Sequence, residues 1–212
     1  HKLSVLLLVG HHMMIMCMNN MEIINLFSIP ILEKTFDFDL AEIQYDCYCK
    51  REIDCGKNVS NVNGWQSSRF KVDNSPLDYF FDEILVSAKE FAKKISLKSD
   101  LIIQTAWINI NGPGAYNQVH DHPSCILSGV FYVKAPEDCG NIEFRHPSLS
   151  KMERDWSHVA EENNKYTSHV WRFIPKENTA YIFPSWLDHQ VFANNSGEDR
   201  ISISFNISKS YK

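Results

Sequence analysis

The chain has 212 residues, which is enough for one well-buried core and too few to favour two independent domains. With 44% hydrophobic residues, 22% charged residues and a net charge of −5, its composition is that of an ordinary globular protein. No basic excess indicates a nucleic-acid partner, and a mildly acidic chain has no electrostatic reason to bind a membrane. The oligomeric state stays open.

The 6 cysteines show no paired zinc-ligand spacing. In a chain with a full hydrophobic core, free thiols in a reducing compartment are the simpler interpretation. We therefore expect a cytoplasmic protein.

The first twenty residues differ in residue pattern from the rest of the chain. A short apolar run from Ser4 to Val9 is ended by Gly10, His11 and His12. It is too short to span a bilayer, and no small-residue cleavage site follows it. We interpret residues 1–20 as a non-native leader, suspect Met21 as the true start, and exclude its histidines from any site.

Two helices are predicted in the first half. Asp39 to Ile53 has helical spacing at Leu40, Ile43 and Cys47, with Asp39 as N-cap, whereas residues 54–74 have no period and predict a loop. Ser75 and Pro76 then have the residue types of a helix start. The second helix has an apolar stripe that we expect to pack against a sheet, made of Leu77, Phe81, Ile84, Leu85, Ala88, Phe91, Ala92 and Ile95.

From Leu101 onward the sequence changes to short β-rich runs bounded by Gly, Pro, Asn or Asp. The predicted strands are Leu101–Ile110, Ile126–Lys134, Asn141–His146, His169–Ile174, Thr179–Phe183, Gln190–Ala193 and Arg200–Ser208. Helices followed by strands favour a mostly β, two-sheet barrel or jelly roll with buttressing helices. Residues 147–168 are polar and predict a long loop, typical of a lid or substrate wall.

Three histidines are candidate metal ligands. His120 and His122 alternate around Asp121, so in a strand both point to one face. His189, from a distant strand, can complete a facial set that leaves positions free for chemistry. The pair alone is weak evidence, and the segments around each histidine strengthen it.

An anion clamp is predicted beside these histidines. Arg200 follows the strand of His189, and arginine binds carboxylates through two parallel hydrogen bonds. Ser202 shares its face, and Tyr132 can present a phenol to the same carboxylate. A lone strand arginine is more often a surface ion pair, and a barrel tyrosine is commonly a core residue.

Several segments resemble one family of putative Fe(II)- and 2-oxoglutarate-dependent oxygenases. They are Asn117–Pro123 with H-x-H-P, Leu127–Val133 with S-G-x-x-Y-V, Phe183–His189 with F-P-S-W-L-x-H, Arg200–Asn206 with R-I-S-I-S-F-N, and Gly64–Ser67 with G-W-Q-S. The resemblance covers residues 22–208 and implies a double-stranded β-helix (cupin-like jelly-roll) fold, Fe(II), 2-oxoglutarate and O2. It implies one oxygenase domain over 21–212, helical over about 36–98 with a β-helix core over about 101–208.

The resemblance makes the expected function a dioxygenase that hydroxylates an unidentified small-molecule or peptide substrate, releasing succinate and CO2. His120, His122 and His189 are then the metal-binding catalytic residues, and Arg200, Ser202 and Tyr132 bind the co-substrate. Gln66 and Ser67 are candidate substrate-pocket residues, although a loop held by Trp65 explains them equally well. Trp107 is assigned to the core.

One departure from the family pattern concerns the third ligand, and three alternatives stay open. His122 stands where the wider superfamily has a carboxylate, and a strand bulge would instead turn Asp121 toward the metal. The second alternative is a cupin-like three-histidine metal dioxygenase that does not use 2-oxoglutarate, since such enzymes exist. The third is a non-catalytic β-sandwich binding module, which needs no such site.

Overall fold

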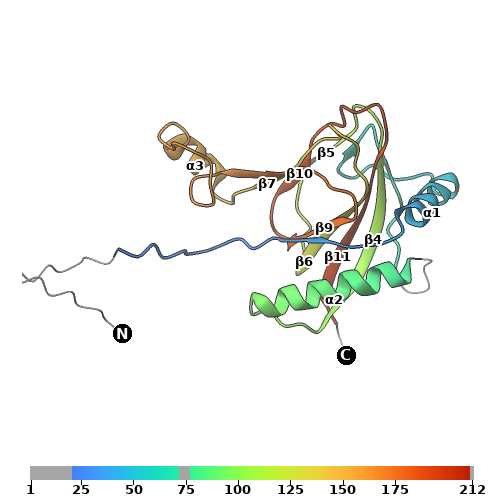
Figure 1. Cartoon of the computed structure of the whole chain (residues 1–212), viewed down its shortest axis with the longest axis horizontal. Coiled ribbons are helices and arrows are strands. Elements are labelled where there is room, and N and C mark those ends of the chain that lie inside the picture. The colour runs from blue at the N-terminus through green and yellow to red at the C-terminus, as the bar shows by residue number, and fades with distance from the viewer. Residues whose placement is uncertain (1–20, 72–76, 211–212) are drawn as a thin grey trace, which may run out of the picture.

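The computed structural model describes residues 21–71 and 77–210. The predicted leader over 1–20 and the predicted helix start at Ser75 and Pro76 lie outside these residues. The helices α1 (Leu40–Ile53) and α2 (Asp78–Lys94) precede most of the strands, and a short α3 (Leu149–Trp156) interrupts them. In Figure 1, α2 lies along one side of the molecule, while α3 stands apart from the sheets at the far end from α1.

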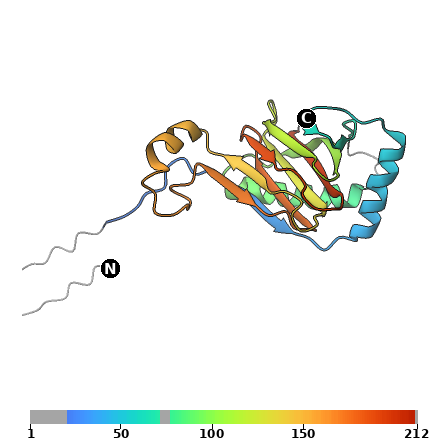
Figure 2. The same cartoon turned by 90° about the horizontal axis from the view of Figure 1, so that it is seen from above.

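Two antiparallel sheets make up the body of the protein. The larger has the order β1 (Leu32–Thr35), β9 (Thr179–Pro184), β6 (Leu127–Lys134), β11 (Arg200–Lys209), β4 (Leu101–Asn111) and β3 (Trp65–Gln66). The smaller has the order β2 (Asn61–Val62), β5 (Tyr116–His120), β10 (His189–Val191), β7 (Ile142–Arg145) and β8 (Val170–Phe173). Figure 2 shows the strands from above, with α1 at one end.

Strand alternation divides the larger sheet into two faces. On β11, Ile201, Ile203, Phe205 and Ile207 join the core that the sheet forms with the helices. The intervening residues therefore face the smaller sheet. This alternation leaves one face of β11 polar and available for a site between the sheets.

The helices cover the outer face of the larger sheet. The Asp39 carboxylate accepts hydrogen bonds from the backbone N–H groups of Ala41 at 3.0 Å and Glu42 at 3.4 Å, which confirms the predicted cap of α1. On α2 and at its N-cap, Leu77, the buried apolar residues are Leu77, Phe80, Phe81, Ile84, Ala88, Phe91 and Ala92. The predicted packing of this stripe against a sheet is confirmed.

A second core lies between the sheets. It joins Val130, Tyr132, Tyr181 and Phe183 of the larger sheet to Ile142 and Phe144 of the smaller sheet. The mostly β, two-sheet architecture with buttressing helices is as predicted.

Three details differ from the sequence-based expectations. The predicted loop over 54–74 contains β2 and β3, whose two-residue strands are too short to carry a recognisable period. The predicted loop over 147–168 contains α3, which has no buried residue and so lacks a core-facing apolar signal. Strand β1 was not predicted. No helix within the described ranges is long and apolar enough to cross a membrane.

Candidate active site

Three histidines meet where β5 and β10 lie side by side. His189 opens β10 and is paired across the strands with His120, the last residue of β5. Their ring centroids are 4.3 Å apart, and the ring of His122 lies 5.1 Å from each of them. One ring nitrogen from each histidine falls within 4.8 Å of the others. The three predicted metal-binding residues are therefore brought together.

His122 lies beyond the end of β5, so strand parity alone does not place it. Its backbone N–H donates to the carbonyl of Ser185 at 2.8 Å, which continues the chain alongside the segment that leads to His189. His122 is 8% exposed, whereas Asp121 is exposed to solvent. The structure thus places His122 in the cluster and turns Asp121 away from it.

Hydrogen bonds to Nδ1 leave the same nitrogen, Nε2, free on all three imidazoles. Nδ1 of His120 lies 2.7 Å from the carbonyl of Gln118, and Nδ1 of His189 lies 2.9 Å from that of Leu187. Because a carbonyl only accepts, both Nδ1 atoms carry the proton and both Nε2 atoms keep a free lone pair. Such outer partners are what metal-binding histidines ordinarily have.

His122 uses a side chain for the same purpose. Its Nδ1 donates to Oδ1 of Asn206 at 2.6 Å, and that oxygen also accepts from the Ser128 hydroxyl at 2.8 Å. Nε2 of His122 is buried and has no hydrogen-bond partner in the described structure. An orphaned, correctly oriented lone pair facing two others fits a divalent metal ion.

Burial keeps the three imidazoles neutral. Desolvation lowers the pKa of His122 to about 4; the hydrogen bond with Asn206 opposes this shift, and the charges of His120 and Arg69 each add a smaller lowering. Desolvation, followed by the charges of His120 and His122, also lowers the pKa of His189 well below its usual value, and desolvation lowers the pKa of His120. Neutral imidazole is the form that binds a metal.

Arg200 is a buried cation without a carboxylate partner. It is 2% exposed, and its Nη1 donates to the carbonyls of Cys139, of Gly140 at 3.4 Å and of Phe192 at 3.1 Å. Its Nη2 has no partner, and no described carboxylate forms an ion pair with it. Desolvation lowers the pKa of this guanidinium. Carbonyls orient the group but leave its charge uncompensated.

Tyr132 and Ser202 lie beside this guanidinium. Both line the cavity that contains Arg200, and the Tyr132 hydroxyl is buried without a hydrogen-bond partner in the part of the chain that is described. Burial raises the pKa of Tyr132, and the charge of Arg200 opposes that shift. The hydroxyl is therefore held as a neutral donor next to a cation.

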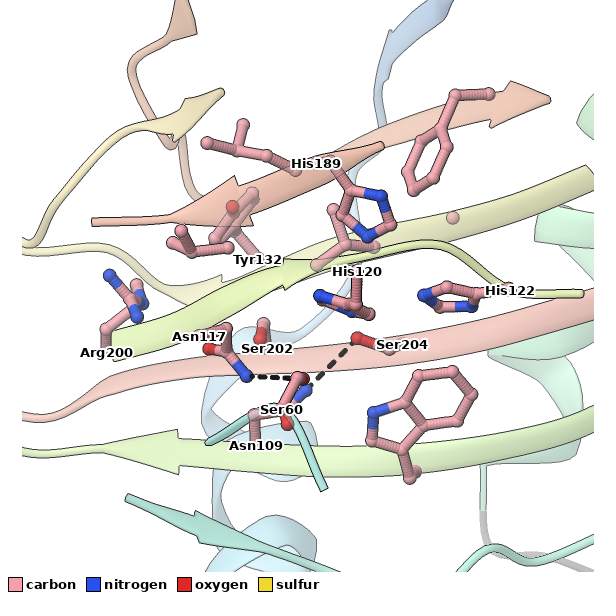
Figure 3. A pocket seen from close by; sticks show the side chains of 16 residues that line it. Ser60, Asn109, Asn117, His120, His122, Tyr132, His189, Arg200, Ser202 and Ser204 are labelled. Atoms are coloured by element: carbon pink, nitrogen blue, oxygen red, sulfur yellow. Dashed lines mark hydrogen bonds between the residues drawn. The ribbon is translucent and has the colours of Figure 1, made fainter. Parts of the chain in front are cut away.

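One narrow cavity connects the histidines to Arg200. In Figure 3 the three imidazoles lie toward one end and Arg200 at the other, with Tyr132 and Ser202 between them. A metal centre and a carboxylate-binding end in one cavity can hold a dicarboxylic acid that also chelates the metal.

Two residues of this site were not identified from the sequence as functional. Asn206 orients His122, and the alternation of Arg200, Ser202 and Asn206 along β11 was a usable signal for its face. Trp107, assigned to the core, is 7% exposed and lines the cavity with its ring 5.4 Å from that of His122. Bulk alone does not distinguish a core tryptophan from a cavity wall.

Comparisons with known proteins agree with this geometry. Residues 105–206 match the family model described as "Putative 2OG-Fe(II) oxygenase". No curated protein matches the chain.

Solved structures share the fold at low sequence identity. A prolyl-4-hydroxylase from Pseudomonas putida aligns with a TM-score of 0.60 and 10% identity, covering 86% of this chain and 94% of that one. The α-ketoglutarate-dependent carbocyclase SnoK from nogalamycin biosynthesis aligns at 0.63 and 12%, covering 86% and 80%. HygX from Streptomyces hygroscopicus, solved with nickel and 2-oxoglutarate, aligns at 0.57 and 9%, covering 87% and 84%. The expected double-stranded β-helix fold is confirmed.

Proposed function

We propose that this chain hydroxylates a C–H bond of its substrate. Over residues 105–206 it belongs to the 2OG-Fe(II) oxygenase family, and it is a 2-oxoglutarate-dependent oxygenase. In the proposed reaction one atom of O2 enters the substrate as a hydroxyl group. The other enters the carboxylate of succinate as 2-oxoglutarate loses CO2.

The Nε2 atoms of His120, His122 and His189 would hold the iron. All three rings are neutral, their Nδ1 protons are bound to acceptors on the protein, and their second nitrogens converge. Iron bound there supplies O2 activation, and the open side of a facial three-ligand set leaves room for co-substrate and O2. The protein's own contribution is to hold the ring orientations and to keep protons off the ligand nitrogens.

Arg200, Ser202 and Tyr132 would bind the far carboxylate of 2-oxoglutarate. The observation that carries this assignment is the buried guanidinium of Arg200, which has an unpartnered nitrogen and no carboxylate in the described structure to neutralise it. A carboxylate ligand would supply the missing charge and accept from Nη2. The adjacent Tyr132 hydroxyl, which has no partner in the described structure, would gain one by donating a hydrogen bond to the same carboxylate.

The test is the affinity for 2-oxoglutarate of the variant Arg200→Gln. Loss of a charge-assisted contact costs about 1.5–3 kcal/mol, so we expect half-saturation by 2-oxoglutarate to rise by one to two decades. Fe(II) affinity should change little, because Arg200 lies at the opposite end of the cavity from the histidines.

Arg154→Gln is the matched control. Arg154 lies on α3, its side chain is 71% exposed and it lines neither end of the cavity, so this variant should behave like the parent protein. An unaltered half-saturation point in Arg200→Gln would refute the assignment of Arg200. Succinate formed in equal amounts with CO2 is the accompanying evidence for the reaction.

A further inference from the structure

A second, wider cavity lies beside the first and shares a wall with it. Ser60, Trp107, His120 and His122 line both cavities. A molecule in the second cavity is therefore next to the proposed iron ligands, on the side away from Arg200. Nothing in the proposed binding of 2-oxoglutarate uses this space.

Gln66 is a lining residue of the second cavity whose side-chain oxygen is buried without a hydrogen-bond partner in the described structure. It is 3% exposed, it lines this cavity, and its Oε1 has no hydrogen-bond partner among the described residues. Its strand β3 is fixed to β4 by the pairing of Gln66 with Asn109. An acceptor buried without a donor costs free energy, and a ligand N–H or O–H group would recover it.

Two opposite charges complete the lining. Arg69 and Asp121 are its only members that carry a full charge when the histidines are neutral, and neither forms an ion pair with any described residue. The Arg69 guanidinium lies 5.6 Å from the centre of the Trp107 ring, which in turn contacts His122. The Trp107 ring thus lies between His122 and Arg69, a cation that has no ion-pair partner among the described residues.

We propose that the second cavity binds the substrate to be oxidised, and that this substrate is a zwitterionic amino acid. Arg69 would bind its carboxylate, Asp121 would face its ammonium group, and Oε1 of Gln66 would accept a hydrogen bond from one N–H of that ammonium group. The identification of this ligand as the substrate rests on the proposed function. The pairing of one cation with one anion disfavours phosphorylated ligands, which would bring excess negative charge to Asp121.

The walls suit a side chain directed toward the metal. The Trp107 ring, Val59, Val119 and Pro123 provide apolar surface around the polar groups. An aliphatic or aromatic side chain in contact with Trp107 would lie against His120 and His122, where its C–H bonds are closest to the proposed iron.

The test measures binding of the twenty standard L-amino acids, one at a time, to the metal-free protein by ligand-observed NMR and calorimetry. We expect at least one to bind, and we expect its carboxamide and its N-acetyl derivative to bind at least about tenfold more weakly. O-phosphoethanolamine, which carries a phosphate in place of the carboxylate, should bind more weakly than the amino acid.

Arg69→Gln is the decisive variant and Lys71→Gln its matched control. Lys71 is an exposed cation two residues away that lines neither cavity. We expect Arg69→Gln to weaken amino-acid binding about ten- to a hundredfold, with Lys71→Gln unchanged. Gln66→Leu should weaken it about tenfold while its circular dichroism stays that of the parent.

The result that would overturn the inference is that no amino acid binds the parent, or that Arg69→Gln and Lys71→Gln bind it equally well. Equal binding of the N-acetyl derivative would overturn the zwitterion assignment. Failure of the proposed function has a separate signature, because the parent would then bind the amino acid but form no succinate from 2-oxoglutarate with or without it.

Discussion

Nε2 of His122, the Tyr132 hydroxyl and Nη2 of Arg200 are three buried polar atoms, all on residues that line one cavity, and none has a hydrogen-bond partner among the described residues. Each such atom ordinarily costs about 1–3 kcal/mol relative to its hydrated state. Three of them in one place are more than folding alone requires. The same atoms are those that would contact a metal and a dicarboxylate, so the free energy lost on folding is recovered on binding.

His120→Ala and His189→Ala test the metal centre. Each removes one of three ligands. Loss of a residue that only orients a metal ligand lowers metal affinity about ten- to hundredfold, so we expect Fe(II) affinity to fall by more than that. The fold should survive, because both rings face the cavity rather than the helix-covered core. Isothermal titration with Fe(II) under argon, with thermal unfolding as the check on folding, measures both effects.

His158→Ala is the control for these variants, since His158 is exposed and lies outside the cluster. Unfolding of either cavity variant at room temperature would contradict the assignment and would indicate a structural role for that histidine.

His122→Ala and His122→Asp distinguish the ligand sets. We expect the alanine variant to bind Fe(II) weakly and to consume little 2-oxoglutarate. The aspartate variant should keep measurable metal binding and some decarboxylation, because it presents a carboxylate from the same position, as in two-histidine, one-carboxylate sites.

Metal affinity of these two variants is compared with that of Asp121→Ala, which should match the parent because Asp121 is exposed. If Asp121→Ala loses the metal and His122→Ala does not, the third ligand is Asp121 and our assignment of His122 is wrong.

At the scale of elements, β11 shows how much a sequence pattern can predict. Arg200 and Ser202 share a face by simple alternation, and that face does lie toward the cavity. The hydrogen-bond acceptors that hold the Arg200 guanidinium could not be predicted. They are the carbonyls of Cys139, Gly140 and Phe192, and backbone carbonyls leave no signature in a sequence. The position of His122 beyond the end of β5 was equally hidden, since it depends on a tertiary backbone contact with Ser185.

Gly140→Ala tests whether the Cys139–Gly140 loop positions Arg200. Gly140 has φ +89°, and a Cβ there would lie 2.3 Å from the carbonyl oxygen of Phe192, which is one of the acceptors of Arg200. We expect a loss of about 1–3 kcal/mol in stability and weaker 2-oxoglutarate binding, with Fe(II) affinity retained.

Gly114→Ala is matched in backbone strain but not in crowding. Its φ is +78°, and nothing lies within 4 Å of the Cβ position. Chemical denaturation should show a smaller loss for this variant, with no change in 2-oxoglutarate binding. Equal effects of the two substitutions on 2-oxoglutarate would mean that the loop does not position the guanidinium.

In the molecule as a whole, the layers turn the polar face of the larger sheet toward the smaller sheet, where the site lies. The helices α1 and α2 cover the outer face of the larger sheet, so its inner, partly polar face meets the smaller sheet (Figure 1). Helix-then-strand order and alternation predicted these layers. The short strands β2 and β3 and the helix α3 were not predictable, because their conformation depends on neighbours rather than on a local apolar period.

We infer above all that one cavity binds Fe(II) and 2-oxoglutarate together. The most direct measurement is an anaerobic titration of the protein with Fe(II) and then with 2-oxoglutarate, followed by visible absorption. We expect a weak charge-transfer band that appears only when both are present, is lost in His120→Ala, and needs a higher 2-oxoglutarate concentration in Arg200→Gln. Tight Fe(II) binding with no band and no effect of 2-oxoglutarate would contradict it, and would favour a three-histidine dioxygenase that binds its substrate directly at the metal.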